Sequence, residues 1–169
     1  DRCVRTVGLM AREPMTQSLP RSYVQVPGVH IEEVGMSAVP VIRKINVEIF
    51  DETRIINRLD RDDLIMLLAY LKEKPIGFKV GYAENSSVFY SAKGGVLPPY
   101  RRRGIARWLL YEMMDRAREK DYAYFAFDTL PNLHHGMTVL GLSEGFEVVG
   151  ASFSEQFEDY ILRFEKSLT

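Results

Sequence analysis

The chain has 169 residues, of which 46% are hydrophobic and 27% are charged, and its formal net charge is −1. This length and balance predict one globular domain with a sizeable core and disfavour two full domains. The near-neutral charge argues against a general nucleic-acid-binding surface. A single cysteine, Cys3, excludes an internal disulfide.

The sequence carries no sign of a membrane-spanning or secretory segment. No apolar run reaches the ~18 to 20 residues that a membrane span needs, and the N-terminus lacks the charged-then-apolar layout of a signal peptide. His134 and His135 are adjacent rather than at metal-ligand spacing, so we expect no metal site. The expectation is a cytoplasmic protein that binds neither membranes nor nucleic acids.

The first part of the chain differs in texture from the rest. Residues 1–27 mix arginine, serine and glutamine with three prolines, which interrupt regular structure. We expect this segment to be an N-terminal extension and residues 28–169 to form the folded domain.

The domain is predicted to begin with a strand and a helix. Alternation over Val29–Val34 is typical of a strand. A helix with Ser37 as its N-cap and Pro40 in its first turn is expected to follow and to end at about Phe50. The charged residues 51–63 predict a second short helix or a loop.

Three strands are predicted next, as an antiparallel meander. Leu64–Leu71 is almost continuously apolar, which suits a strand buried on both faces. Turn residues at 72–75 and 84–87 separate it from Ile76–Tyr82 and from Val88–Val96.

A helix follows the meander and begins near Arg103 or Gly104. Its apolar residues recur at helical spacing: Ala106, Leu109, Leu110, Met113, Met114 and Ala117. Tyr122–Thr129 is a predicted aromatic strand, followed by a helix at about Gly136–Ser143 and by strands at Phe146–Gly150 and Tyr160–Phe164. A meander, a crossover helix and a return strand make an α/β architecture, in which the strands before and after the helix are parallel. We assign Trp108, Tyr122, Tyr124, Phe125 and Phe127 to the core.

The turn before this helix has the features of an anion site. Arg101, Arg102 and Arg103 place three positive charges beside the unpaired N–H groups and the positive dipole end of the helix. Gly104 lacks a Cβ where a phosphate approaches the main chain, and Ala106 keeps the next turn open. The pattern predicts a diphosphate site; a solvated basic face or a nucleic-acid patch is the alternative.

These residues resemble motif A of the GNAT acyltransferase superfamily. Arg101, Gly104 and Ala106 fill the positions of Arg/Gln-x-x-Gly-x-Gly/Ala. The preceding strand end and a later Gly-Phe pair also match, at Val96, Pro98 and Gly145-Phe146. The resemblance covers roughly residues 29–166.

The resemblance implies a mixed central sheet of about six to seven strands flanked by helices. It implies an N-acetyltransferase that moves an acetyl group from acetyl-CoA directly to a primary amine of a small molecule or peptide; a homodimer is left open. In this family two parallel strands splay apart to hold the acyl-CoA arm, and Gly94-Gly95 is where a bulge or close approach is expected; easing of the sheet twist is the alternative. The expected cofactor residues are Gly94, Gly95 and Val96 for the pantetheine arm, and Arg101, Arg102, Arg103, Gly104, Ile105, Ala106 and Arg107 for the pyrophosphate.

The catalytic residues depart from the family pattern. Alignment on Gly145-Phe146 puts Gly141 where the family frequently has a tyrosine acid, and His134 at its asparagine position. Another group then protonates the thiolate, or the thiolate leaves unprotonated; a non-catalytic acyl-CoA-binding module is the alternative function. Asn132 replaces the family asparagine or is a turn residue, and Asp128 is the first candidate for the base. His134 is also a catalytic candidate, and the other candidates are His135, Thr129, Tyr90, Ser91, Glu48, Asp51 and Glu52.

Overall fold

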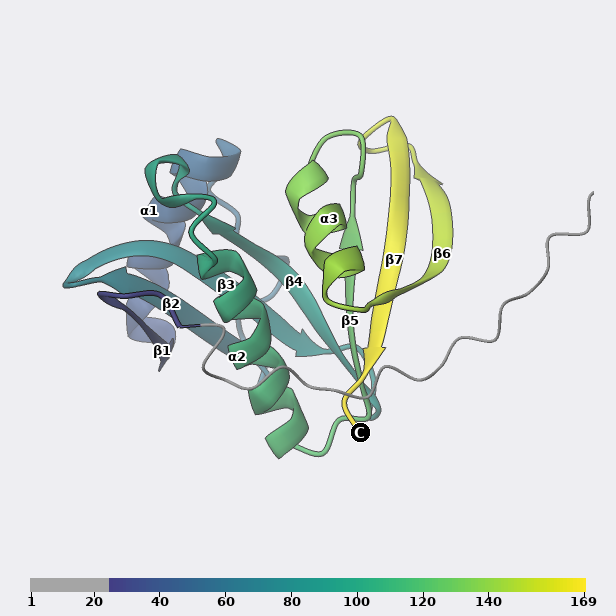
Figure 1. Cartoon of the computed structure of the whole chain (residues 1–169), viewed down its shortest axis with the longest axis horizontal. Helices are drawn as coiled ribbons and strands as arrows, with labels where there is room; N and C mark the ends of the chain where they lie inside the picture. Colours follow the sequence, from purple (N-terminus) through teal and green to yellow (C-terminus); the bar gives the residue numbers. More distant parts are fainter. Residues whose placement is uncertain (1–24) are drawn as a thin grey trace, which may run out of the picture.

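The computed structural model describes residues 25–169, so the structure leaves nearly all of the predicted extension at 1–27 outside the described residues. A seven-stranded mixed sheet forms the centre of the described chain. One helix, α1, covers one face of the sheet, and α2 and α3 cover the other (Figure 1). The predicted fold class, a mixed sheet of six to seven strands flanked by helices, is confirmed.

The strand order in the sheet is β1-β2-β3-β4-β5-β7-β6, and only the β4–β5 pair is parallel. This arrangement confirms both the antiparallel meander and the crossover through the long helix. The elements in chain order are β1 (Val29–Val34), the 3-10 helix η2 (Met36–Ala38), α1 (Val39–Phe50), β2 (Ile65–Leu71), β3 (Lys74–Ala83), β4 (Val88–Val96), the 3-10 helix η3 (Pro98–Tyr100), α2 (Ile105–Glu119), β5 (Tyr124–Thr129), α3 (His135–Ser143), β6 (Glu147–Ser154) and β7 (Asp159–Ser167).

The parallel strands β4 and β5 part after a short stretch of pairing. Their only paired residues are Val88 with Tyr124, Phe89 with Phe125 and Tyr90 with Ala126. Beyond these pairs β4 continues against β3, whereas β5 continues against β7. The two strands therefore enclose a V-shaped opening in the sheet (Figure 1).

The bulge in β4 lies two residues earlier than the paired glycines. Val80 of β3 pairs with Lys93 and Gly81 pairs with Ser91, so Ala92 is the extra residue on β4. Of the bulge or close approach expected at Gly94-Gly95, the bulge is absent, because both glycines keep regular partners on β3. The close approach is present, because a Cβ on Gly94 would lie 2.9 Å from the main-chain carbonyl oxygen of Phe78.

The start of α1 differs from the prediction. Ser37 belongs to η2, and the N-cap of α1 is Ala38, with no side-chain hydrogen bond. The N–H of Ala38 donates to the carbonyl of Gly35 over 3.0 Å. This 3-10 turn satisfies the main chain locally, so Ser37 does not cap the helix. Pro40 does lie in the first turn of α1, as predicted.

Residues 51–63 form a loop and no second helix. The buried side chain of Asn46 on α1 holds this loop through hydrogen bonds from Nδ2 to the carbonyls of Glu52, over 2.7 Å, and Arg54, over 3.2 Å.

The apolar stripe of α2 packs on the sheet and differs from the predicted stripe at one residue. Ile105, rather than Ala106, is buried, and Ala106 lies exposed. Among the aromatic residues assigned to the core, Tyr124 is 46% exposed and that assignment was wrong. The other four pack in or against the cluster beneath α2.

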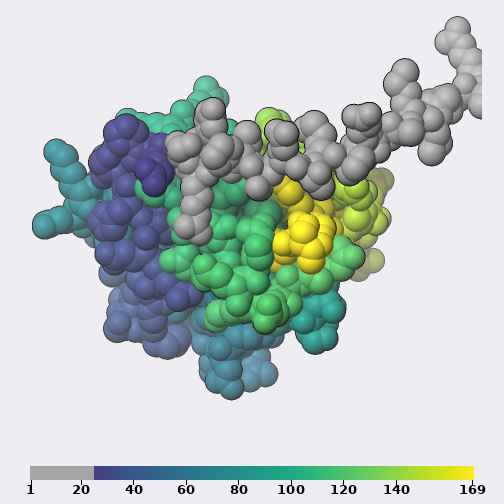
Figure 2. Space-filling model, turned by 60° about the horizontal axis from the view of Figure 1, so that its bottom comes forward, coloured from purple at the N-terminus to yellow at the C-terminus, as the bar shows by residue number. Residues whose placement is uncertain are grey.

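The C-terminal end of the chain packs beside α2. Leu168 is buried, and its carbonyl accepts a hydrogen bond from Nε of Arg118 over 2.9 Å. In the space-filling view the yellow C-terminus lies against the green surface of α2 and of the segment that follows it (Figure 2). Within residues 25–169, no helix combines the length and hydropathy needed to cross a membrane.

Candidate active site

The turn between β4 and α2 presents main-chain N–H groups at the start of a helix. Gly104, the N-cap, has a φ of 86°, and Arg102 has a φ of 62°. Left-handed residues in such a turn direct N–H groups into a shared concavity that suits anions. No side chain caps α2, and its first turn holds no acidic residue. These N–H groups and the helix dipole favour a phosphate at this end.

Two of the turn's arginines also hold its shape. Nε of Arg101 donates to the carbonyl of Val96 over 2.8 Å, and Nη2 of Arg103 donates to that of Pro99 over 3.4 Å. Arg102 lies exposed between them. The turn thus keeps a concentration of positive charge next to the end of β4.

The first turns of α2 are joined to the end of α3 by one buried carboxylate. Nη1 of Arg107 donates to Oε1 of Glu144 over 3.4 Å, and the hydroxyl of Tyr111 donates to Oε2 over 2.5 Å. Burial and this hydrogen bond raise the pKa of Tyr111. Nζ of Lys166 on β7 donates to the main-chain carbonyl of Glu144 over 2.7 Å. Glu144 therefore fixes the predicted phosphate-binding end of α2 relative to α3.

The glycines at the end of β4 allow neighbouring groups to pack closely on the main chain beside the opening. A Cβ on Gly94 would lie 2.9 Å from the carbonyl oxygen of Phe78, and one on Gly95 would lie 2.9 Å from Cδ1 of Ile49. Both distances are too short for a side chain without movement of the neighbour. Together with Val96, these residues lie beyond the last pair with β5. Their edge has no partner strand on the β5 side and offers main-chain groups to a bound chain-like molecule, except for the Val96 carbonyl, which Arg101 occupies.

Asp128 and Tyr90 meet where the two strands part. The hydroxyl of Tyr90 donates to Oδ2 of Asp128 over 2.7 Å. Phe89 and Phe127 face α2, so their neighbours Tyr90 and Asp128 face the opposite side of the sheet. Burial, and then the hydrogen bond to Asp128, raise the pKa of Tyr90 well above its ordinary value. Tyr90 therefore stays protonated and acts as a donor to the carboxylate.

Arg163 on β7 supplies positive charge to the same place. Its Nη1 lies 3.9 Å from Oδ2 of Asp128, and its guanidinium lies 5.3 Å from the centre of the Tyr90 ring. Its two Nη atoms donate to the carboxylate of Glu84 over 2.8 and 2.7 Å. This pairing raises the pKa of Arg163. Asp128 thus has a hydrogen-bond donor on one side and a fixed positive charge on the other.

The other two predicted catalytic residues have different partners. Nδ2 of Asn132 donates to Oδ1 of Asp159 over 2.8 Å, which joins the β5–α3 connection to the start of β7. The ring of His134 lies edge-on to Phe50 at 6.4 Å, which joins the same connection to the end of α1. Within residues 25–169, no hydrogen bond connects either residue to Asp128.

Gly141 packs directly on the aromatic core. A Cβ at this position would lie 2.8 Å from Cζ of Phe127 and 3.1 Å from Cδ1 of Phe164. These two rings stack at 5.2 Å with an angle of 8°. The ring of Phe127 thus fills the space into which a side chain at 141 would point, which explains the absence of a tyrosine there.

The acidic residues of the loop at 51–63 are largely engaged in ion pairs. Oε1 of Glu52 pairs with Nζ of Lys93 on β4, and this ammonium lies 4.7 Å from the centre of the Phe50 ring. Two further carboxylates pair with arginines of the same loop: Asp60 with Arg58 over 3.1 Å, and Asp63 with Arg61 over 2.9 Å. The loop therefore presents less free negative charge than its sequence suggests.

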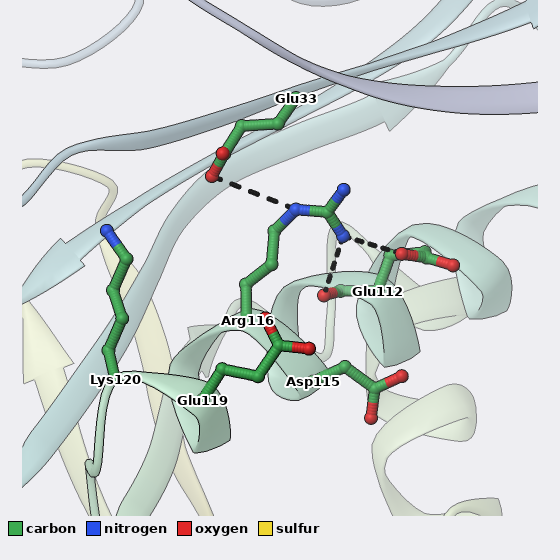
Figure 3. Close-up of a pocket in the computed structure, with 6 residues that line it drawn as sticks. All are labelled: Glu33, Glu112, Asp115, Arg116, Glu119 and Lys120. Carbon is green, nitrogen blue, oxygen red and sulfur yellow. Dashed lines mark hydrogen bonds and ion pairs between the residues drawn. The ribbon is translucent and has the colours of Figure 1, made fainter.

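A charged hollow lies toward the other end of α2 (Figure 3). Its arginine, Arg116, contacts Glu33 of β1 over 3.7 Å and Glu112 over 2.6 Å. With its charge matched by two carboxylates, this hollow is unsuited to a phosphate. Six residues line it: Glu33, Glu112, Asp115, Arg116, Glu119 and Lys120.

A mixed sheet whose parallel strands part beside an uncapped, arginine-rich helix start defines the acyl-CoA N-acyltransferase fold. The acetyltransferase (GNAT) family model matches residues 39–137, which is more than half of the chain. The chain belongs to this family, whose members are acetyltransferases. A search among curated proteins gave no significant match.

Several solved structures share the fold at low identity. The ribosomal-protein-S18-alanine N-acetyltransferase of Escherichia coli has a TM-score of 0.73 and 13% identity, over 83% of this chain and 94% of that one. Naa50 of Arabidopsis thaliana, in complex with a bisubstrate analogue, has a TM-score of 0.69 and 20% identity, over 83% and 99% of the two chains. NAA60 of the same plant, with acetyl-CoA, has a TM-score of 0.67 and 16% identity, over 82% and 98%.

Proposed function

We propose that this protein transfers the acetyl group of acetyl-CoA directly to a primary amine. The observation that carries the proposal is the parting of β4 and β5 beside the uncapped start of α2. The strand edge of β4 beyond its last pair with β5 supports a bound pantetheine arm, and the left-handed turn at Arg102 and Gly104 supports a bound pyrophosphate. The residues present therefore fit acetyl-CoA.

Asp128 is the proposed general base. Its carboxylate is one-third exposed and lies at the apex of the opening, on the face opposite α2. There it can take the proton that the amine loses as the new bond forms. The hydrogen bond donated by Tyr90 orients the Asp128 carboxylate, and the guanidinium of Arg163 on β7 forms an ion pair with this carboxylate. Asn132 and His134 are proposed to shape the entrance rather than to move protons, because their contacts join loops.

The amine acceptor is proposed to be a small molecule or a peptide amine. Naa50 of Arabidopsis thaliana has been solved with the analogue CoA-Ac-MVNAL, which joins CoA to a peptide. A peptide N-terminus therefore belongs in the set of amines to be tested, beside lysine and small amines.

The second candidate function is a non-catalytic acyl-CoA-binding module. Gly141 favours it, because no phenol can occupy this position beside Phe127 and Phe164. The two functions differ in turnover and not in binding.

The test follows free thiol while the protein is incubated with acetyl-CoA and the set of amines. An acetyltransferase releases thiol steadily in the presence of one amine, whereas a binding module does not. We expect Asp128→Asn to lower kcat/KM about a hundredfold, within the range of general base catalysis, with melting temperature and acetyl-CoA affinity retained. Glu73→Gln, in the exposed β2–β3 turn, is the matched control. Equal rates for Asp128→Asn and the control would remove Asp128 from the mechanism.

A further inference from the structure

Lys79 is a buried lysine on β3, close to the opening between β4 and β5. Only 5% of its surface is exposed. Within residues 25–169 its ammonium has no hydrogen-bond or ion-pair partner. A buried charge without a partner costs stability, so packing alone does not account for a lysine at this position.

The strand register places Lys79 on the face of the sheet that α2 covers. Lys79 pairs with Leu67 of β2 and with Gly94 of β4. Leu67 belongs to the core beneath α2, and paired residues share a face. Gly94 lies beyond Tyr90, the last β4 residue that pairs with β5. Lys79 is therefore one strand away from the opening, at the level of Gly94.

The first part of the Lys79 side chain packs directly against Gly94. Its Cγ lies 3.2 Å from the position that a Cβ on Gly94 would occupy. Neighbouring strands are ~4.8 Å apart, and the flexible four-carbon stem of a lysine can cross this distance. Gly94 thus has a second role, because a side chain there would block the path of the Lys79 stem.

We propose that the Lys79 ammonium contacts the sulfur of bound CoA and protonates it as the thioester breaks, which fills the role left open by Gly141. This inference rests on the proposed function. The acceptor nitrogen bonds to the acetyl carbon, the bond from that carbon to sulfur breaks, and its electron pair stays on sulfur. Lys79 gives this sulfur a proton, and Asp128 takes the proton that the amine loses. Water returns a proton from Asp128 to Lys79, and the products are an amide and the free CoA thiol.

The acidity of Lys79 suits this transfer. Burial lowers the pKa of Lys79 to about 8, close to the ~8.5 of an alkyl thiol. Matched pKa values allow a proton to move between two groups with little cost. On the elements packed against β3, Lys93 of β4 contacts Glu52, and Arg107 and Tyr111 of α2 contact Glu144. The β2 residue paired with Lys79, Leu67, is apolar.

The first test titrates the thiol of bound CoA by its ultraviolet thiolate absorption. The difference between CoA-bound and CoA-free protein cancels the chain's own cysteine. An adjacent ammonium stabilises a thiolate, so we expect about tenfold more thiolate in the wild-type complex than in free CoA at the same pH. Lys79→Met should abolish this excess, and Lys79→Leu serves as a second apolar variant. Lys44→Met, an exposed lysine on α1, should match wild type.

The second test is the pH profile of turnover with the best amine. Wild-type kcat should fall as pH rises past about 8, where Lys79 loses its proton. Lys79→Met should lower kcat about a hundredfold and leave KM for acetyl-CoA near its wild-type value. The kcat of this variant should no longer decrease as pH rises past about 8.

Three results would overturn the inference. If bound CoA has the same thiolate fraction in wild type and in Lys79→Met, the Lys79 ammonium does not contact the CoA sulfur. Loss of CoA binding in both apolar variants, with melting curves intact, makes Lys79 a binding residue instead. A wild-type protein that does not bind CoA at all refutes the proposed function and the inference with it.

Discussion

Lys79 is a residue at which stability and the proposed chemistry oppose each other. The fall of its pKa from 10.5 to about 8 on burial corresponds to a cost of about 3 kcal/mol at neutral pH. Between about pH 8 and pH 10.5, Lys79 is mostly protonated in the unfolded chain and mostly deprotonated in the folded chain. The stability of the wild-type protein therefore gains from rising pH in this window, because deprotonation relieves the buried charge.

We predict that Lys79→Met raises the free energy of unfolding by about 3 kcal/mol at pH 7. The gain should shrink as pH rises from about 8 toward about 10.5, the folded and unfolded values for Lys79. Denaturant unfolding of both proteins across this range measures the difference directly. If the difference in the free energy of unfolding between wild type and Lys79→Met is independent of pH, or if Lys79→Met is less stable at pH 7, the Lys79 ammonium is solvated or paired in the folded protein.

Two glycines of α3 give a matched pair. A Cβ on Gly141 would meet Phe127 at 2.8 Å, whereas a Cβ on Gly136 has nothing within 4 Å. Gly141→Ala should lower the free energy of unfolding by about 1–3 kcal/mol, because it overpacks the aromatic core. Gly136→Ala should raise it by about 0.5–1 kcal/mol through helix propensity. Equal changes in the two denaturation midpoints would show that the rings yield to the new methyl group.

The sequence reveals the identity of such residues but not their surroundings. The absence of a tyrosine at 141 is visible from its spacing to Gly145-Phe146. The packing of Phe127 and Phe164 against this position is not, because the two rings come from strands far apart in the chain. Lys79 likewise stands within a predicted strand. Its burial and its approach to Gly94 depend on the pairing of β3 with β4.

At the scale of elements, local signals predicted most of what the structure contains. Hydrophobic periodicity placed α2, and turn residues separated the meander strands, because both depend on neighbours in sequence. The capping rule failed at Ser37, where a 3-10 turn precedes α1. The bulge at Ala92 and the bridge from Arg107 through Glu144 depend on contacts between distant segments, which a single sequence does not reveal.

At the scale of the whole molecule, the two faces of the sheet divide the proposed chemistry. Asp128 and Tyr90 lie on the face opposite α2, where the amine would lose its proton. Lys79 lies on the α2 face, where the departing sulfur would gain one. Under the proposal, a thioester held where β4 and β5 part would be approached by Asp128 from one face and by Lys79 from the other. This arrangement depends on the parting of the strands, which the family resemblance predicted.

The central claim is that this opening, with the start of α2, binds acetyl-CoA. Calorimetric titration of acetyl-CoA into wild type, Gly104→Glu and Gly35→Glu tests it most directly. Gly104 has a φ of 86° at the predicted phosphate site, whereas Gly35 is exposed with no atom within 4 Å of an added Cβ. We predict one bound acetyl-CoA per chain for wild type and Gly35→Glu. Gly104→Glu should weaken binding about a hundredfold or more, or ~3 kcal/mol, because a carboxylate would stand where the phosphates lie. Unchanged affinity in Gly104→Glu, or no binding by the wild-type protein, would contradict the account.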